Sequence, residues 1–422
     1  MSSVITIAID QLKPGMFIVG MDQPWHRTPF LFHKRLIRQT EEIDLLRQHG
    51  IKEVSIDLSK GIDVAELSVE KDSDLNGRTE DETERTLIQS SQGETSLPLS
   101  PQEKTAAAQA TYAEATITMD RLFAGLEAGT MPQPDTLRSI VENILARVLD
   151  DRTSMLSLLS LQQMKRFDRS LASHALDICI LSLILASECG VAEQDREALG
   201  VGALLHDIGY IRLPRNLYRK NGALTEQERT LMRQHPALGL AIVSDSKEDR
   251  DAVRRIVAEH HERCDGNGFP HGLKGDSLSK LGQIVGLANE YDGMVSRRGG
   301  DPSVMPHDAI RQLFYLGSTG QFSKELVESV VKTLGVYPIG SLVQLNTKEQ
   351  AVVMAVNPAQ RLKPMVKIIT GPHGESYSSP PAIDLANQPE GTPARAITRV
   401  LDPLHEHVNV AIFFDSMGDQ AA

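Results

Sequence analysis

The sequence predicts a multidomain, mainly α-helical protein with a small α/β domain at its N-terminus and a β-rich module at its C-terminus. Three observations lead to this expectation. Apolar residues recur every three or four positions from about residue 106 to residue 334, which is the helical period. Strand-like runs occur in residues 4–9 and again after residue 335. With 422 residues, the chain is too long for one ordinary hydrophobic core.

Residues 1–65 are expected to form the small α/β domain. Residues 4–9 alternate with the period of a strand, and Lys13-Pro14-Gly15 signals a turn. A short helix is predicted over residues 43–48, and residues 51–56 return to strand alternation. Residues 66–105 are polar and contain almost no residues suited to a core, so they are predicted to be a flexible linker.

Residues 106–150 are predicted to be connecting helices, and residues 151–335 the helical domain that carries the chemistry. Thr225 and Glu228 have the spacing of a capping box at a helix start. Pro236 follows His235 directly, which favours a change of chain direction there. Residues 336–422 are predicted to be the β-rich module, because three strand-like runs are separated there by Gly, Pro and Asn.

Composition excludes several classes of protein. The formal net charge of -12 argues against a general binder of nucleic-acid polymers or of membrane surfaces, which would need a positive field. The three cysteines form no CxxC pair, so neither a zinc knuckle nor a disulfide framework is expected. The N-terminus does not resemble a signal peptide, and the apolar run at residues 178–186 is too short to span a bilayer. A soluble, cytoplasmic protein is expected.

Histidine and acidic residues cluster between residues 206 and 270, with one further histidine upstream on an apolar helical segment. An imidazole nitrogen supplies one metal ligand and an aspartate can bridge two ions, so the cluster predicts a buried two-metal site. One such histidine alone is more often a core residue, but core histidines have no reason to cluster. The residues are His174, His206-Asp207, His235, His260-His261-Glu262 and Asp265-Gly266-Asn267-Gly268-Phe269-Pro270.

This arrangement closely resembles the HD-GYP family, the signalling branch of the HD metal-dependent phosphohydrolases, over about residues 151–335. The family pattern is a His, then His-Asp, then a His followed by a small residue or Pro, then His-His-Glu, then Asp-Gly-x-Gly-Tyr-Pro. Both the order and the separations match, and residues 4–57 look like the small domain that often precedes the family's catalytic domain. The family hydrolyses cyclic di-GMP, a bacterial second messenger, to linear pGpG or GMP with two metal ions, commonly iron or manganese.

The resemblance implies a role for each residue. One metal ion would take His174, His206 and Asp207, with Asn289 as a weak further ligand. The other ion would share Asp207 and take His235, His260 and His261. Asp207 and His206 are the implied catalytic residues. The implied substrate-binding residues are Tyr210, Asp265, Gly266, Gly268, Phe269, Pro270 and Arg298. The implied partners are cyclic di-GMP and, through the Gly-Phe-Pro loop, diguanylate cyclases, with no nucleic-acid polymer and no membrane.

The chain departs from the family pattern at several positions. Asn289 replaces an Asp that completes the first metal site, and Glu290 or Asp292 could replace it if the helix rearranged. Tyr210 replaces a Lys that can contact phosphate, and Phe269 replaces the Tyr of Gly-Tyr-Pro. Asp301 takes a second basic position, and Ser170 stands where three-metal members place a Glu, which argues against a third ion.

These departures leave three hypotheses open. The first is a cyclic di-GMP phosphodiesterase. The second is a catalytically impaired member that binds cyclic di-GMP or a diguanylate cyclase and acts as a sensor or interaction module. The third is a phosphohydrolase for another nucleotide, against which the Gly-Asn-Gly-Phe-Pro segment argues.

Overall fold

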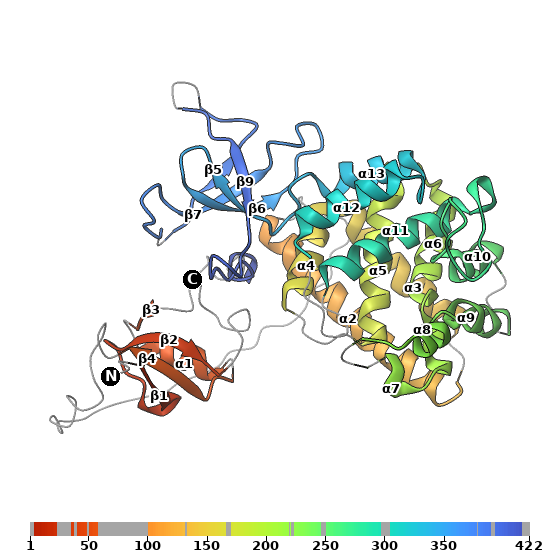
Figure 1. Ribbon diagram of the computed structural model, residues 1–422, viewed down its shortest axis with the longest axis horizontal. Coiled ribbons are helices and arrows are strands. Elements are labelled where there is room, and N and C mark those ends of the chain that lie inside the picture. Colours follow the sequence, from red (N-terminus) through yellow and green to blue (C-terminus); the bar gives the residue numbers. More distant parts are fainter. Residues whose placement is uncertain are drawn as a thin grey trace, which may run out of the picture. The chain divides into compact units, whose positions relative to one another are not determined.

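The structure, a computed structural model, describes residues 4–22, 35–37, 40–48, 50–57, 100–130, 133–165, 170–218, 220, 223–245, 250–296, 304–377, 379–389 and 393–415. Arg298, Asp301 and most of the predicted linker lie outside these residues. The chain divides into two compact units, one of Met1–Pro101 with His407–Asn409 and one of Gln102–Glu406 with Val410–Ala422. The N-terminal unit is red in Figure 1.

The N-terminal unit is a four-stranded antiparallel sheet with one α-helix, a small α/β domain as predicted, although the sequence indicated only the strands at residues 4–9 and 51–56. The strand order is β1-β4-β2-β3. Alternating residues of β2 and β4, among them Ile18, Val54 and Ile56, are buried and pack with Leu46 of the helix. The elements are β1 (Val4–Ala8), the 3-10 turn η1 (Ile9–Gln11), β2 (Phe17–Met21), β3 (Arg35–Leu36), α1 (Thr40–Gln48) and β4 (Glu53–Asp57).

The second unit begins with the helical domain, drawn from orange to cyan in Figure 1. Its helices are α2 (Pro101–Glu127), α3 (Pro134–Asp150), α4 (Arg152–Lys165), α5 (Leu171–Glu188), α6 (Glu193–Leu205), α7 (Arg215–Tyr218), α8 (Glu226–Met232), α9 (His235–Ser244), α10 (Asp251–Glu259), α11 (Lys280–Val295), α12 (Pro306–Ser318) and α13 (Lys324–Leu334). Two 3-10 turns, η4 (Ile208–Arg212) and η5 (Gly275–Ser277), join some of them.

Helix α5 is the centre of the helical domain. The Ser170 side chain accepts a hydrogen bond from the Ser173 backbone N–H and so caps the first turn. Every residue from 172 to 186 is buried, because the helix is apolar all round and has neighbours on all sides. These neighbours are α3, α4, α6, α11 and α13. By length and composition α5 could cross a membrane, but 83% of it is buried inside the protein, as in the core helix of a water-soluble domain.

Helix α2 begins earlier than the sequence pattern indicates. It starts at Pro101, so residues 101–105, predicted to belong to the linker, form its first turn. Proline is favoured in the first turn of a helix, where its missing N–H is not needed. The buried side chains of α2 start only at Ala108 and continue through Tyr112, Ala115 and Met119. The polar first turn therefore carries no apolar periodicity from which to predict it.

The C-terminal module is a five-stranded antiparallel sheet, followed by a short helix. The strand order is β8-β7-β6-β5-β9. The sequence predicts the three central strands, whose apolar residues Val343, Val353, Val366 and Ile368 form the core. The two edge strands bury only one of their residues, Leu401, and lack that signal. The elements are β5 (Leu342–Leu345), β6 (Gln350–Ala355), β7 (Met365–Thr370), β8 (Ala382–Asp384), β9 (Ile397–Leu401) and α14 (Ile412–Asp415).

Helix ends position the predicted ligands. His206 is the C-cap of α6, His260 is the C-cap of α10, and His235 is the first residue of α9. The capping box predicted for Thr225 and Glu228 is present at the start of α8. Turn η4, which follows Asp207, packs directly on α9. The contact depends on Gly209, since a Cβ atom there would lie 1.9 Å from the carbonyl oxygen of His235.

We predict that Gly209→Ala lowers the free energy of unfolding of the helical domain by about 2 kcal/mol, because η4 and α9 must move apart. Gly293→Ala is the matched control. Gly293 is exposed in α11 with no atom within 4 Å of its added Cβ, so alanine there should stabilise the helix slightly. Urea unfolding followed by circular dichroism measures both changes. Equal stability of the two variants would contradict the close approach.

Candidate metal centre

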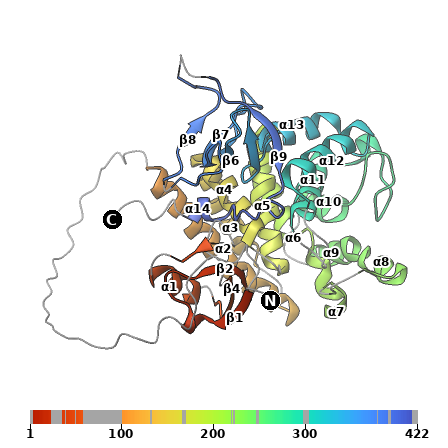
Figure 2. The same cartoon turned by 60° about the vertical axis from the view of Figure 1, so that its left-hand side comes forward.

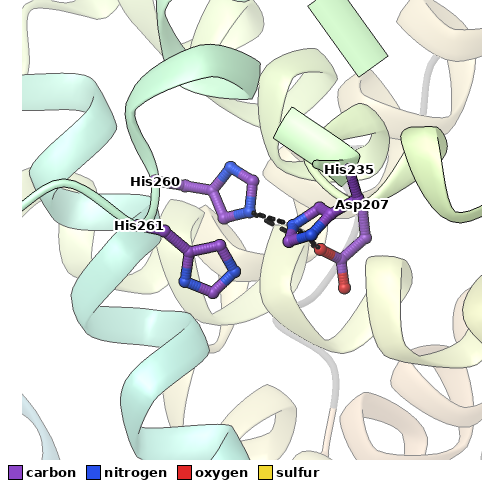
Figure 3. Close-up of side chains that lie close together, drawn as sticks. All are labelled: Asp207, His235, His260 and His261. Carbon is purple, nitrogen blue, oxygen red and sulfur yellow. Dashed lines mark hydrogen bonds and ion pairs between the residues drawn. The ribbon is translucent and has the colours of Figure 1, made fainter. Parts of the chain in front are cut away.

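Six of the predicted ligands converge in two overlapping groups inside the helical domain. One group is Asp207, His235, His260 and His261, drawn in Figure 3, and the other is His174, His206 and Asp207. Within each group the candidate ligand atoms all lie within 4.8 Å of one another. Asp207 belongs to both groups, so one carboxylate stands between two sets of imidazoles. These are the two sets that the HD-GYP resemblance implies.

The centre is deeply buried except on one side. His174, His206, Asp207, His235 and His260 each expose 1% of their surface or less. His261 is only half-buried. Among the six clustered ligands, His261 alone is partly exposed.

Backbone carbonyls orient three of the imidazoles. The Nδ1 atoms of His206, His235 and His260 lie 2.7, 2.8 and 3.0 Å from carbonyl oxygens three residues earlier in the chain. A carbonyl oxygen can only accept, so each Nδ1 carries the proton. The Nε2 atom of each ring is then left with a free lone pair that points at Asp207. This arrangement prepares each ring as a metal ligand.

A carboxylate orients the fourth imidazole. The Nδ1 atom of His174 lies 3.0 Å from Asp292 Oδ2. Asp292 is fully buried and also accepts hydrogen bonds from Gln163 Nε2 and Ser296 Oγ, both at 3.1 Å. The carboxylate is thus committed to holding His174. The sequence signal for this role is weak, because the two residues are 118 positions apart and meet only through the packing of α5 on α11.

Neither acidic neighbour of Asn289 is placed to act as a replacement ligand. Asp292 is used as just described, and Glu290 is paired with Arg263 at 2.6 Å. Asn289 itself lies at the site, with its Oδ1 atom 3.1 Å from His174 Nε2. An amide oxygen can bind a metal ion but brings no negative charge. The first ligand set therefore has less charge compensation of its own than a set completed by a carboxylate.

In the neutral tautomers with the proton on Nδ1, the lone pairs in the centre face one another. His235 Nε2 lies 3.1 Å from His260 Nε2 and 3.2 Å from Asp207 Oδ1. With both Nδ1 atoms protonated, all three atoms are acceptors. Among the described residues, His206 Nε2 and both oxygens of Asp207 have no hydrogen-bond partner. Buried acceptors without donors are costly, and a cation among them removes that cost. The donor set thus fits divalent metal ions.

The protonation states also suit metal binding. Burial lowers the pKa of His260 to about 4, and burial together with the neighbouring imidazoles lowers the pKa of His261 well below its usual value. Burial alone would raise the pKa of Asp207, but the surrounding histidines hold it well below its ordinary range. Near neutral pH these two imidazoles are therefore neutral and the carboxylate is charged, which are the forms that ligate metals.

Two aromatic rings brace the second ligand set. Tyr210 stacks on His235 with ring centroids 4.1 Å apart and an interplanar angle of 16°. Phe269 stacks on His261 at 4.5 Å and 18°. Tyr210 is buried against this candidate ligand, at the position where the HD-GYP resemblance implies a lysine. Phe269 has the aromatic ring of the Gly-Tyr-Pro tyrosine, and this ring packs against the candidate ligand His261.

The Gly-Asn-Gly-Phe-Pro loop is shaped by Glu262. This buried carboxylate accepts hydrogen bonds from the backbone N–H groups of His271 and Leu273, at 2.6 and 3.0 Å. Gly268 lies against the preceding chain, since a Cβ atom there would come within 2.4 Å of Glu262 Cα. Asp265 accepts from the backbone N–H of Asn267 at 2.9 Å. Asp265 and the loop glycines thus set the form of the loop beside the centre.

The remaining predicted positions are less central. Pro270 is exposed at the end of the loop, and Gly266 adopts a φ of +81° in its turn. Ser170 caps α5 and has no carboxylate with which to bind a third metal ion. Arg298 lies outside the described residues.

Comparison with known families agrees with this geometry. Residues 141–317 match a family model described as "HD domain". The helical domain is therefore similar to HD domains. Residues 4–136 match a "Domain of unknown function (DUF3391)", and residues 342–403 match a "KOW domain associated with HD domain".

The relatives are bacterial phosphodiesterases. The chain is 28% identical over 372 residues to "Cyclic di-GMP phosphodiesterase PA4108" of Pseudomonas aeruginosa, covering 86% of this chain and 84% of that protein. It is 37% identical over 153 residues to a "Cyclic di-GMP phosphodiesterase" of Thermotoga maritima, covering 36% and 41%. It is 29% identical over 166 residues to "3'3'-cGAMP-specific phosphodiesterase 2" of Vibrio cholerae, covering 39% and 31%. The predicted HD-GYP resemblance is confirmed.

We predict that Asp292→Asn weakens metal binding at the first ligand set by about 10- to 100-fold, because His174 loses the carboxylate that orients it and raises its basicity. The second set does not touch Asp292 and should bind as before. Titration calorimetry with manganese on metal-stripped protein resolves the two affinities. Glu290→Gln, on the same helix but paired with Arg263, is the control and should leave both affinities unchanged. Two unchanged affinities in Asp292→Asn would contradict the role of Asp292.

Proposed function

We propose that this protein hydrolyses cyclic di-GMP to pGpG or GMP with two divalent metal ions, iron or manganese, in the cytoplasm. The observation that carries the proposal is the meeting of four oriented imidazoles, those of His174, His206, His235 and His260, on the buried carboxylate of Asp207. The names of the relatives from Pseudomonas aeruginosa and Thermotoga maritima support the substrate. Divalent ions in such a site lower the pKa of bound water and neutralise the charge that develops on a phosphate.

The chain's own residues supply position and charge. Asp207 holds both ligand sets together. The His206 ring lies beside it and is oriented by the hydrogen bond from its Nδ1 atom to the carbonyl oxygen of Ala203. Because imidazole binds a metal ion in its neutral form and only one carboxylate belongs to the two ligand groups, two bound divalent ions would leave the centre with net positive charge. A cyclic dinucleotide carries two phosphodiester anions and is attracted to that charge.

The substrate is expected to reach the centre from the half-buried side of His261. Phe269 lies on that side, with the loop of Asp265, Gly266, Gly268 and Pro270. These residues form the floor and edge of the proposed binding site. Tyr210 acts through its packing on His235, and Arg298 is proposed as a further phosphate contact.

A sensor or interaction module is the second candidate function, and the amide of Asn289 favours it. A weaker first metal site lowers turnover while leaving binding of cyclic di-GMP intact. In that case the Gly-Phe-Pro loop is the expected contact with a diguanylate cyclase. The relative named for 3'3'-cGAMP points to a second cyclic dinucleotide to be assayed beside cyclic di-GMP.

We predict that Asp207→Ala abolishes hydrolysis and removes most of the bound metal, because this carboxylate belongs to both ligand groups. The helical fold should persist, since the carboxylate forms no hydrogen bond with a donor in the described part of the chain. Metal analysis, circular dichroism and turnover of cyclic di-GMP check these expectations. Unchanged turnover would refute the proposed chemistry.

We predict that Asn289→Asp raises occupancy of the first metal site, because a carboxylate replaces a neutral amide. If the parent is an impaired enzyme, turnover should rise about tenfold or more, which corresponds to about 1.4 kcal/mol of transition-state stabilisation. If it is a sensor, occupancy should rise without turnover. Metal content and hydrolysis are measured for parent and variant together. A parent that already holds two metals and turns over fully would contradict the impairment.

A further inference from the structure

One arginine stands at the open side of the metal centre. Arg233 lies two residues before His235, between α8 and α9, and its side chain is exposed. Its guanidinium carbon lies over the ring of Phe269, 5.5 Å from the centroid. Phe269 in turn stacks on His261, the half-buried member of the candidate ligands. A cation is therefore held one aromatic ring away from a candidate metal ligand.

Arg233 differs from neighbouring arginines in having no carboxylate partner. Arg229, one turn earlier, pairs with Glu226 at 3.5 Å, and Arg263 pairs with Glu290. Across the described part of the chain, no carboxylate oxygen forms an ion pair with the Arg233 side chain within 4.0 Å. Stacking on a ring restricts a guanidinium while leaving its N–H donors free. Arg233 is thus available for an anion from solution.

Arg263, just before the Gly-Asn-Gly-Phe-Pro loop, is already paired with Glu290 and so offers less charge to a substrate. Tyr210, three residues after Asp207, stands where the HD-GYP resemblance implies a lysine, and it is buried against His235. Cyclic di-GMP has two phosphodiesters, and the metal centre can act on only one at a time. The other must lie outside the ligand cluster, where only the protein can compensate its charge.

We propose that Arg233 is a substrate-positioning residue that binds the phosphodiester of the cyclic dinucleotide which is not at the metal centre. Its planar fork of N–H donors matches two phosphate oxygens. This inference rests on the proposed function and extends it, since it assigns the role of the absent lysine to a residue on a different element. Phe269 serves as the platform that holds the guanidinium in reach.

The test compares Arg233→Ala with Arg229→Ala as a control. Arg229 lies one turn earlier and is already paired with Glu226, so its replacement removes the same positive charge without removing an unpaired guanidinium. Arg233→Ala should raise KM for cyclic di-GMP about tenfold with little change in kcat, and Arg233→Lys should restore part of the loss. Hydrolysis of bis(p-nitrophenyl) phosphate, which has one phosphodiester, and the bound metal should both stay at parent level. Arg229→Ala should match the parent throughout.

Three outcomes would overturn the role of Arg233. The first is a parental KM for cyclic di-GMP in Arg233→Ala, and the second is an equal loss in Arg229→Ala. The third is a parallel fall in bis(p-nitrophenyl) phosphate hydrolysis and bound metal, which would indicate damage to the centre.

The same samples separate this inference from the proposed function. A parent that neither binds nor hydrolyses cyclic di-GMP would refute both. A parent that binds without turnover would refute the enzyme only. The dissociation constant of Arg233→Ala from equilibrium dialysis then replaces KM, with the same tenfold increase expected. A parent with normal turnover and an unaffected Arg233→Ala would refute Arg233 alone.

Discussion

The helical domain is organised around one electrostatic constraint, the buried carboxylate of Asp207 surrounded by imidazole lone pairs. Acceptors in a water-free interior repel one another unless a proton or metal ion lies among them. The protons of His206, His235 and His260 are already used on backbone carbonyls. The cost of this arrangement is relieved by cations, so metal binding and the packing of the helix ends are expected to stabilise each other.

Helix ends give this centre its precision. His206, His235 and His260 lie where α6, α9 and α10 begin or end, and each ring bonds to a carbonyl of the adjoining turn. The ring orientation thus follows from the backbone, without a separate set of side chains for each ligand. Close backbone contact at Gly209 then brings the start of α9 beside Asp207. A side chain at that position would separate two ligands of the same metal.

The two halves of the centre differ in how they are supported. The second set has three imidazoles, with Tyr210 and Phe269 stacked on two of them. The first set depends on His174, which is held by Asp292, and ends in the neutral amide of Asn289. Charge compensation is therefore weaker in the first set, so the second site is expected to bind its metal ion before the first. The choice between enzyme and sensor depends on that difference.

The sequence by itself determined the fold class and the family, because helical and strand periods and the spacing of His and Asp residues are local properties of the chain. It also identified the residues that meet at the centre. It did not reveal the bond between His174 and Asp292, the stacking of Tyr210 on His235, or Arg233 over Phe269. These contacts join residues far apart along the chain. Tertiary packing alone decided these contacts: α5 packs on α11, and η4 and the Gly-Asn-Gly-Phe-Pro loop lie near α9. The direction of a side chain is set by its neighbours in space.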